Sequence, residues 1–397
     1  MDYKKLLLQV ERTLEQIDTR DVSSGTVEQI AETIAANFRD ALGITGGRVY
    51  ECTEEMTYVL VGRFGESQIA ELGIVVPNDY KPLQLVRENG VVVMDPTDPG
   101  VDPVLEEKLG ARRFAAIAVG DEKYVLSFDI APGLGTDDIH FSLNLIRYAI
   151  NQKVKAARYE ALIVEAQRIQ QSILPQRIPQ YKGFDIWGQT VAAEIVSGDF
   201  YDFIPLTDDI LGLAIADGSG HGLPAALVVR DVYMGLRMAT DRDFKIVRTM
   251  QKLNHIIHRS RMTTKFVSLF YGELETGGIL IYTNAGHNFP FVLKGDSVEL
   301  LKNGGPVLGP TPDATYTRGF MKLDPGDLLC MYSDGIVEAR DTRDTEYGME
   351  QLIDVVRANR SRSAQDIGQA VLAHVANWAP VAEDDRSVVI VKATPDA

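Results

Sequence analysis

The sequence predicts an α+β protein with two domains joined by a long helix, the second domain holding two packed β-sheets flanked by helices. Three observations lead to this prediction. Strand-like apolar runs and helical patterns are interleaved along both halves, residues 138–173 contain neither glycine nor proline, and two runs of strands enclose a pair of helices in the second half. A chain of 397 residues is long enough for two domains, each with its own core.

Composition and charge narrow the class of partner. The formal net charge of −16 disfavours binding to nucleic acid or to an anionic membrane, because both are polyanions. The two cysteines, Cys52 and Cys330, lie in separate strand-like runs, and we interpret them as buried thiols in a reducing compartment. No apolar run has the length of a signal-peptide core or a membrane span, so we expect a cytoplasmic protein.

The first half predicts an amino-terminal helix in residues 1–21 and a mixed domain over residues 22–137. Apolar residues recur at helical spacing up to Ile17, and Thr26 is expected to cap a second helix with Gln29 as its partner. Strand-like runs follow at 48–51, 57–62, 91–94, 114–119 and 124–130.

The linking segment, residues 138–174, predicts one helix from about Asp138 to Ile173. Apolar residues form a short heptad seam along it, namely Ile150, Val154, Ala157, Ala161 and Val164. A long helix that is polar outside its seam needs a partner. We expect a parallel homodimer through this helix, with packing along its own domains as the alternative. The seam is rich in alanine and interrupted by Arg168, so the coiled coil should be weak.

Residues 175–397 predict a second α+β domain. Strands are expected at 184–191, 203–206, 210–216, 267–274, 279–284, 291–294, 328–333 and 387–392, and helices at 223–238, 243–259, 349–358 and 364–378.

Four aspartates at strand ends, Asp199, Asp217, Asp334 and Asp384, are the candidate functional residues. A strand end holds a carboxylate rigidly. Several converging carboxylates, without clustered cysteine or histidine, suit hard cations such as Mg²⁺ or Mn²⁺, as in two-metal hydrolases. The alternative for any single Asp-Gly pair is an ordinary tight turn.

The motifs around these aspartates are similar to those of a known protein family. Residues 166–393 resemble the catalytic domain of bacterial PPM-type (protein phosphatase 2C-like) serine/threonine phosphatases, in particular the SpoIIE-type branch. Matching segments occur in family order at 166–175, 198–202, 216–226, 284–288, 305–309, 332–339 and 384–387. The amino-terminal domain is similar, in element order, to a GAF sensor domain.

This resemblance implies a site that holds two Mn²⁺ or Mg²⁺ ions. It casts Asp217 as the carboxylate shared by both ions, with the Gly218 carbonyl as a further ligand. It places Asp199 on the second ion, and Asp334 and Asp384 on the first. Asp385 competes with Asp384 for the last position, and the family spacing to the following serine selects Asp384.

Other residues near the motifs carry weaker expectations. Ser197 replaces the glycine usual in the family and would strain the loop if the position required a positive φ. Asp202 is interpreted as either a third-metal ligand or an outward turn residue. His221 and His287 are interpreted as structural residues of glycine-containing turns rather than general acids.

The resemblance implies a metal-dependent phosphoserine/phosphothreonine protein phosphatase in which the metals activate a water for direct attack on phosphorus. Its implied substrate is a small STAS-domain, anti-anti-sigma-factor-like protein in a partner-switching pathway under the control of the sensor domain. The alternatives are a catalytically weak sensor or scaffold that retains the fold, and a diguanylate cyclase. The cyclase reading rests on the Ser197–Phe200 segment alone and leaves three aspartate motifs without a role.

Overall fold

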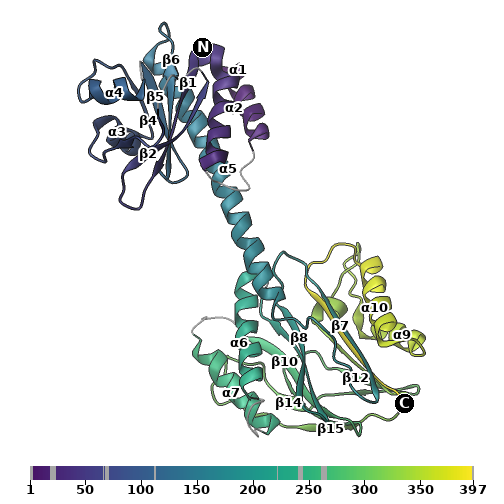
Figure 1. The fold of residues 1–397 in the computed structure, drawn as a ribbon. Coiled ribbons are helices and arrows are strands. Elements are labelled where there is room, and N and C mark those ends of the chain that lie inside the picture. Colours follow the sequence, from purple (N-terminus) through teal and green to yellow (C-terminus); the bar gives the residue numbers. More distant parts are fainter. Residues whose placement is uncertain are drawn as a thin grey trace. The chain divides into compact units, whose positions relative to one another are not determined.

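The computed structural model describes residues 3–17, 24–65, 67, 71–110, 113–220, 222–239, 245–260 and 266–395 (Figure 1). The chain divides into two compact units, Met1–Leu162 and Ile163–Ala397, and the boundary falls within the helix α5, Thr136–Gln171. In the described part of the chain, we find no helix with the length and apolar character needed to cross a membrane.

The amino-terminal unit is built on a six-stranded antiparallel sheet with the strand order β3-β2-β1-β6-β5-β4. Its strands are β1 (Ile44–Cys52), β2 (Tyr58–Gly65), β3 (Val75–Val76), β4 (Val91–Met94), β5 (Phe114–Val119) and β6 (Tyr124–Ile130). Its other helices are α1 (Tyr3–Gln16), α2 (Ser24–Leu42), α3 (Lys81–Asn89) and α4 (Pro103–Leu109). Helices α1, α2 and α5 pack on one face of the sheet, and α3 and α4 cover the other (Figure 1).

Both faces of this sheet are apolar, which explains why it needs helices on each side. Residues at helical spacing on α2, such as Ile30, Ile34 and Phe38, are fully buried against one face. On the other face, Asp102 caps α4 by accepting hydrogen bonds from the backbone N–H groups of Val104 and Leu105.

The predicted elements of this unit are found, with additions. β4, β5 and β6 have the predicted bounds, whereas α3, α4 and β3 were not predicted. The expectation that Thr26 caps α2 is wrong, because the helix begins at Ser24 and Thr26 lies within its first turn.

The carboxy-terminal unit consists of two β-sheets packed face to face, with one helical layer on each outer side (Figure 1). One sheet has the order β14-β11-β10-β9-β8, with β15 also paired to β11, and the other has the order β13-β12-β16-β17-β7. Helices α6 and α7 pack on the first sheet, and α9 and α10 pack on the second. The predicted architecture of two packed sheets flanked by helices is confirmed.

The strands of this unit are β7 (Phe184–Val191), β8 (Asp199–Thr207), β9 (Ile210–Gly218), β10 (Val267–Glu275), β11 (Ile279–Ala285), β12 (Phe291–Lys294), β13 (Ser297–Leu300), β14 (Gly304–Gly305), β15 (Gly319–Lys322), β16 (Leu328–Tyr332) and β17 (Arg386–Ala393). The helices are α6 (Leu223–Ala239), α7 (Ile246–Arg259), α8 (Asp334–Val337), α9 (Gly348–Asn359) and α10 (Ala364–Trp378). The expected start of α7 at residue 243 lies outside the described residues. β13, β14, β15 and α8 were not predicted.

Helix α5 begins and ends two residues earlier in the sequence than expected. The heptad seam is interrupted in a way the sequence pattern did not indicate. Ile150 and Val154 are buried in the core of the amino-terminal unit, whereas Ala161 and Val164 are exposed. The seam therefore does not form one continuous exposed stripe.

Candidate active site

Two of the predicted site aspartates lie side by side on neighbouring strands of one sheet. Asp199 is the first residue of β8 and pairs directly with Asp217 on β9. Asp199 is buried, and its Oδ2 accepts a hydrogen bond of 2.6 Å from the hydroxyl of Ser387. Because Ser387 lies on β17 of the other sheet, this bond connects the two sheets beside the site.

The other two aspartates lie at adjoining strand ends of the second sheet. Asp334 follows β16 and begins α8, while Asp384 precedes β17, which pairs antiparallel with β16. The backbones are joined here through Ser333, which donates from its N–H to the Ser387 carbonyl oxygen and accepts at Oγ from the Ser387 N–H.

Asp385 has a different role from its neighbour. Its side chain is buried and accepts three hydrogen bonds, from the Ala193 N–H at 2.8 Å, the Ser197 hydroxyl at 2.8 Å and the Gly198 N–H at 2.6 Å. Asp384 is exposed. These contacts make Asp385 the anchor of the loop before β8, and the assignment of Asp384 as the metal ligand stays a prediction.

Ser197 does not strain this loop. It is absent from the described non-glycine residues with positive φ, and its hydroxyl oxygen also accepts a hydrogen bond from the Asp199 N–H at 3.0 Å. Ser197, which stands where the family usually has glycine, therefore adds two hydrogen bonds next to the predicted ligand Asp199.

The carboxylates raise one another's pKa. Burial, and next the repulsion from Asp334 and Asp384, raises the pKa of Asp217 to about 8. Burial, followed by repulsion from Asp384 and Glu338, raises the pKa of Asp334 to about 6. Burial and then the charge of Asp217 raise the pKa of Asp199 well above its ordinary value. Close, partly desolvated carboxylates of this kind favour an environment that supplies positive charge.

Glycines allow the chain segments of the site to approach closely. A Cβ on Gly335 would overlap the backbone carbonyl oxygen of Asp385, so only glycine fits directly after Asp334. A Cβ on Gly218 would lie 2.8 Å from the Ala225 carbonyl oxygen and 2.9 Å from Val229 on α6. Gly218, predicted to offer its carbonyl to a metal, also donates its N–H to the Gly198 carbonyl oxygen at 3.1 Å.

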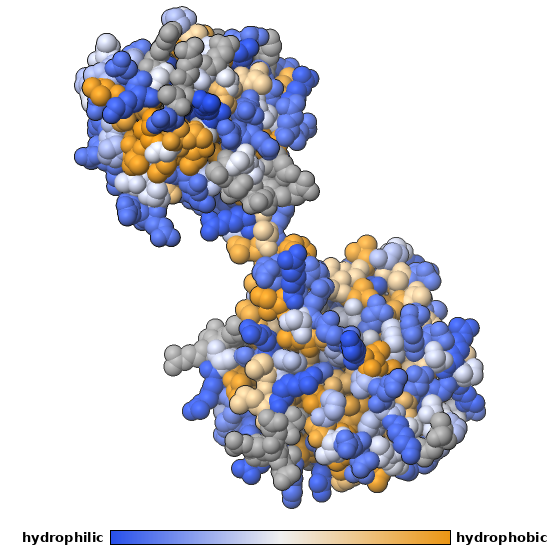
Figure 2. Space-filling model, in the orientation of Figure 1, coloured by the Kyte–Doolittle hydropathy of each residue, from blue (hydrophilic) through white to orange (hydrophobic). Residues whose placement is uncertain are grey.

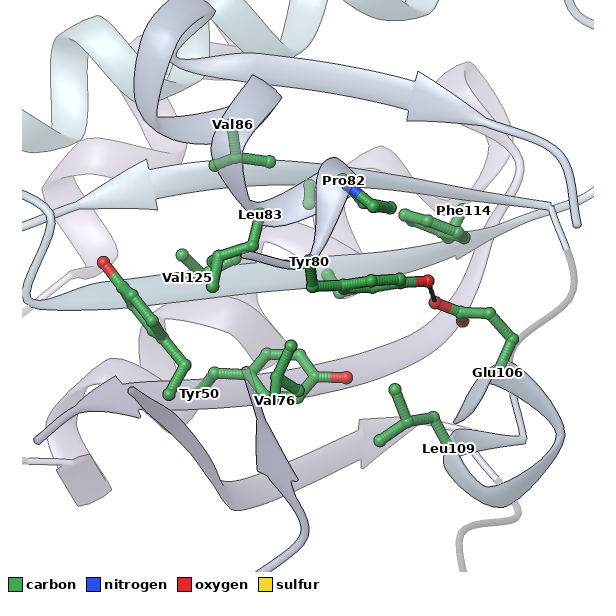
Figure 3. A pocket seen from close by; sticks show the side chains of 13 residues that line it. Tyr50, Val76, Tyr80, Pro82, Leu83, Val86, Glu106, Leu109, Phe114 and Val125 are labelled. Carbon is green, nitrogen blue, oxygen red and sulfur yellow. Dashed lines mark hydrogen bonds between the residues drawn. The ribbon is translucent and has the colours of Figure 1, made fainter. Parts of the chain in front are cut away.

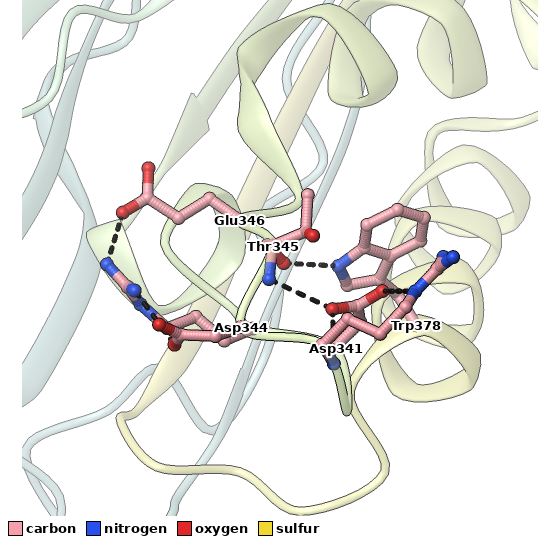
Figure 4. Close-up of polar contacts among 7 residues, drawn as sticks. Asp341, Asp344, Thr345, Glu346 and Trp378 are labelled. Carbon is pink, nitrogen blue, oxygen red and sulfur yellow. Dashed lines mark hydrogen bonds and ion pairs between the residues drawn. The ribbon is translucent and has the colours of Figure 1, made fainter.

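An open pocket of about 550 Å³ borders the site at Asp384, and Glu338, Glu383 and Arg340 also line it. Arg340 is held in a turn, where it donates to Asp344 Oδ1 at 2.9 Å and Glu346 Oε1 at 2.6 Å (Figure 4). Other contacts close the same turn: the Asp341 carboxylate accepts from the Thr345 N–H, and the Trp378 indole N–H donates to the Thr345 carbonyl oxygen (Figure 4).

The donor set suits a hard divalent cation, because every candidate ligand is an oxygen atom and the crowded carboxylates gain from added positive charge. Within the described residues, however, no three side chains of histidine, cysteine, aspartate or glutamate are placed so that they could hold one ion. The residues therefore fit such ions in donor chemistry and charge alone.

Three further predicted residues can now be placed. Asp202 is not an outward turn residue: it is buried on β8 and forms an ion pair with Arg237 of α6 at 2.7 Å. His287 is buried, and its Nδ1 lies 2.7 Å from the hydroxyl of Ser268, in keeping with a structural role. His221 lies outside the described residues.

Sequence reasoning missed the serines that connect the sheets and the contact from the end of α5. Gln170 is buried, and its side-chain amide lies 3.5 Å from the Asp199 carbonyl oxygen. Gln170 belongs to one of the segments that matched the family in order, and Ser387 belongs to another, two residues after Asp385. The positions of Gln170 and Ser387 within the matched motifs could have indicated that both residues lie near the site. No residue pattern, however, indicates a contact between two sheets.

The carboxy-terminal unit is similar in sequence to known proteins. Residues 207–394 match the family model of Stage II sporulation protein E (SpoIIE). The matched range includes Asp217, Gly218, Asp334, Asp384 and Asp385, and Asp199 lies just before it. The phosphoserine phosphatase RsbU of Bacillus subtilis is 28% identical over 224 residues, which is 55% of this chain and 64% of RsbU. Protein IcfG of Synechocystis sp. is 27% identical over 372 residues, which is 83% of this chain and 56% of IcfG.

Solved structures share the fold of the carboxy-terminal unit. The SiaA-PP2C domain of Pseudomonas aeruginosa has a TM-score of 0.54 at 18% identity, over 60% of this chain and 97% of that domain. The RsbU and RsbW domains of Rv1364c from Mycobacterium tuberculosis give 0.51 at 23% identity, over 57% of this chain and 64% of that one. The carboxy-terminal unit therefore has the PP2C fold, and most of it matches the SpoIIE family model. The chain spans 56% and 64% of the lengths of the two curated relatives named above.

Proposed function

We propose that this chain is a metal-dependent phosphoserine/phosphothreonine protein phosphatase. The convergence of Asp199, Asp217, Asp334 and Asp384 from two sheets, with the pKa values of the first three raised by burial and mutual repulsion, carries the proposal. A phosphorylated side chain brings further negative charge to this site. Turnover would therefore require a source of positive charge, and a divalent cation bound by these carboxylate oxygens would supply it.

In this proposal Asp217 would contact two Mn²⁺ or Mg²⁺ ions, together with the Gly218 carbonyl oxygen. Asp199 would complete one ion site, and Asp334 with Asp384 the other. Such ions supply a water of lowered pKa and neutralise charge on the phosphoryl oxygens. The chain's own contribution is orientation: Ser387 holds the Asp199 carboxylate, and Asp385 holds the backbone before it.

The test is hydrolysis of a phosphoserine peptide by the full chain. We expect activity with Mn²⁺ or Mg²⁺ and none in excess chelator. Asp217→Asn should lower turnover at saturating Mn²⁺ to less than about a tenth of wild type without changing the circular dichroism spectrum. Asp208→Asn, a matched change at an exposed aspartate of the β8–β9 turn, should keep full activity.

Two results would contradict the assignment. Undiminished hydrolysis in chelator would remove the two-metal site, and an active Asp217→Asn enzyme would place the site elsewhere. A folded chain that hydrolyses no phosphopeptide under any metal condition would instead support the alternative of a sensor or scaffold that retains the fold.

The proposed substrate is a phosphorylated STAS-domain protein of a partner-switching pathway, acted on under the control of the amino-terminal unit as a GAF-like sensor. RsbU, a curated relative, is named a phosphoserine phosphatase, which supports this substrate chemistry. Faster release of phosphate from a phosphorylated STAS domain than from a peptide of the same phosphosite sequence would support the proposal, and equal rates would contradict it.

We also propose that the chain forms a homodimer through α5. Residues 158–165 of this helix are exposed throughout, including Tyr159, Leu162 and Val164 at 55%, 59% and 42%. Exposed apolar side chains on a helical segment favour a partner helix.

A further inference from the structure

Three exposed apolar side chains lie around the candidate active site. Ile195, Leu223 and Val381 belong to the loop before β8, the first turn of α6 and the loop before β17, and they are 51%, 46% and 77% exposed. Figure 2 shows apolar surface at the end of the carboxy-terminal unit where the last turns of α5 lie in Figure 1. The contact of Gln170 with Asp199 places the site at the same end. Grouped apolar side chains that remain exposed mark a contact surface.

Ile195 is presented to solvent by an anchored loop. The Asp385 carboxylate accepts hydrogen bonds from the N–H groups of Ala193 and Gly198, one on each side of Ile195. The neighbouring Val196 is buried, whereas Ile195 is half exposed. Because the loop is already fixed, a partner that covers Ile195 does not have to order the loop first.

Leu223 lies on the segment next to this loop. It is the first residue of α6, and the preceding Gly222 has a φ of 71°. A Cβ added to Gly222 would lie 3.0 Å from Glu194 Oε2, so the start of α6 lies beside the residue that precedes Ile195. Leu223 and Ile195 are therefore carried by adjoining segments of one surface.

Val381 belongs to the part of the site that the second sheet supplies. The buried Arg386 donates from Nη2 to the carbonyl oxygens of Ala379 and Val381, at 2.9 Å and 3.2 Å, and this fixes the loop before β17. Val381 and Asp384 line the same open pocket. Apolar side chains on anchored segments of both sheets therefore border the site.

Within the described residues, the exposed charges at this pocket are mainly acidic. Glu338 and Glu383 line it, and both are exposed. Arg340 already donates to two carboxylates of its own turn, and Arg386 is buried. An acidic segment next to a phosphorylated residue would be repelled here, whereas an uncharged apolar segment would not.

The internal cavity of the amino-terminal unit is too small to act as a recognition site. Leu83, Val86 and Phe114 face it (Figure 3), and its volume is about 40 Å³. Pockets for small molecules typically measure about 300–1,000 Å³. The exposed side chains around the active site are therefore the stronger evidence for a binding surface in this chain.

We propose that Ile195, Leu223 and Val381 form a docking surface for the phosphoprotein substrate. This substrate carries apolar side chains on both sides of its phosphoserine and no acidic residue beside it. The inference rests on the proposed phosphatase function, because a substrate whose phosphoserine enters the site covers the surface around it. Burial of the exposed apolar side chains stabilises the complex, and the anchored loops keep the entropy cost of docking small.

Three phosphoserine peptides of equal length test the preference in the full chain at saturating Mn²⁺. They differ only at the second and fourth positions on each side of the phosphoserine, where they carry leucine, glutamine or glutamate. We expect kcat/KM for the leucine peptide to exceed that for the glutamine peptide at least fivefold, and the glutamate peptide to be the poorest. Equal values for the leucine and glutamine peptides, or a preference for the glutamate peptide, would overturn the proposal.

Two variants assign the preference to this surface. Ile195→Gln/Leu223→Gln and, separately, Val381→Thr should each reduce the preference for leucine over glutamine at least threefold, mainly through KM. The matched control Met234→Gln/Met238→Gln changes two exposed apolar residues on the last two turns of α6 and should keep the preference of wild type. An unchanged preference in both surface variants would refute the assignment.

p-Nitrophenyl phosphate, which has no flanking residues, separates this proposal from the phosphatase assignment. Hydrolysis of this compound together with equal kcat/KM for the peptides would overturn the docking surface alone. No hydrolysis of any substrate would refute the phosphatase function and this proposal with it. A changed sedimentation coefficient of Ile195→Gln/Leu223→Gln without a changed peptide preference would assign the surface to a second copy of the chain and overturn the proposal.

Discussion

Asp384 and Asp385 show how adjacent residues of the same type take different roles. Asp385 is buried and accepts three hydrogen bonds from the loop before β8, whereas Asp384 is exposed beside an open pocket. Spacing within a motif selected Asp384 as the ligand. The contacts that make Asp385 a structural residue come from segments about 190 residues away, as the separation of 188 between Asp385 and Ser197 illustrates.

We expect the two asparagine variants to separate activity from stability. Asp384→Asn should abolish most turnover with little change in the melting temperature, because the residue is exposed. Asp385→Asn loses an acceptor for buried donors and should lower the free energy of unfolding by about 1–3 kcal/mol, with the smaller loss of activity at saturating metal. Phosphopeptide assays and denaturant unfolding check both. A larger activity loss in Asp385→Asn would exchange the two roles.

His287 should make stability depend on pH. Burial lowers the pKa of His287 to about 4, below the ordinary value of 6.5 that applies in the unfolded chain. Below pH 6.5 the unfolded chain binds a proton that the folded chain does not, so this contribution to stability is present above pH 6.5 and is lost as the pH falls toward 4. The loss is on the order of 3 kcal/mol.

Denaturant unfolding of His287→Gln and wild type between pH 7 and pH 4 measures this contribution. The variant should lose less stability over that interval than wild type, while His255→Gln, at an exposed position, should follow wild type. Parallel curves for wild type and His287→Gln would show that the histidine is not buried in its neutral form.

At the scale of elements, the outer helices are positioned by close approach to the sheets. Gly368 of α10 is buried where the helix crosses Trp187 of β7, and an added Cβ would overlap the indole ring. Ion pairing contributes on the opposite side, where Arg237 of α6 contacts the buried Asp202 of β8. These contacts fix helices that the sequence pattern placed along the chain but not on a particular sheet.

Gly368→Ala should therefore destabilise the chain by about 1–3 kcal/mol, because overpacking outweighs the better helix propensity of alanine. Gly277→Ala is the control, since an added Cβ there meets nothing within 4 Å. Thermal unfolding compares them. Equal melting temperatures would indicate that α10 shifts to accept the methyl group.

At the scale of the whole molecule, α5 is the element that sequence periodicity described least well. Its seam was predicted as one stripe, but Ile150 and Val154 belong to the amino-terminal core. Charges at Val154 would therefore unfold that core and would report nothing about association. The exposed residues Leu162 and Val164 are the informative positions for the proposed dimer.

We expect Leu162→Glu/Val164→Glu to convert a dimer into a monomer and to change the phosphatase rate in the same preparation. The control Gln152→Glu/Ala156→Glu adds the same charge at exposed positions of α5 and should leave the dimer intact. Sedimentation velocity and phosphopeptide assays measure both properties. A monomeric variant with the wild-type rate would reduce α5 to a passive connection, and a monomeric wild type would refute the dimer.

The sequence alone determined the two-domain α+β organisation, many strand bounds, and the set of aspartates at strand ends, because these depend on local periodicity and short motifs. β5, β6, β7 and β12 were predicted to the residue, since each is a short segment rich in apolar and β-branched or aromatic residues. Only the tertiary structure decided the partners: Ser387 on Asp199, Asp385 on the loop at Ser197 and Arg237 on Asp202. Each of these pairs joins segments distant in sequence, and which segments meet follows from sheet order and packing, which no local pattern encodes.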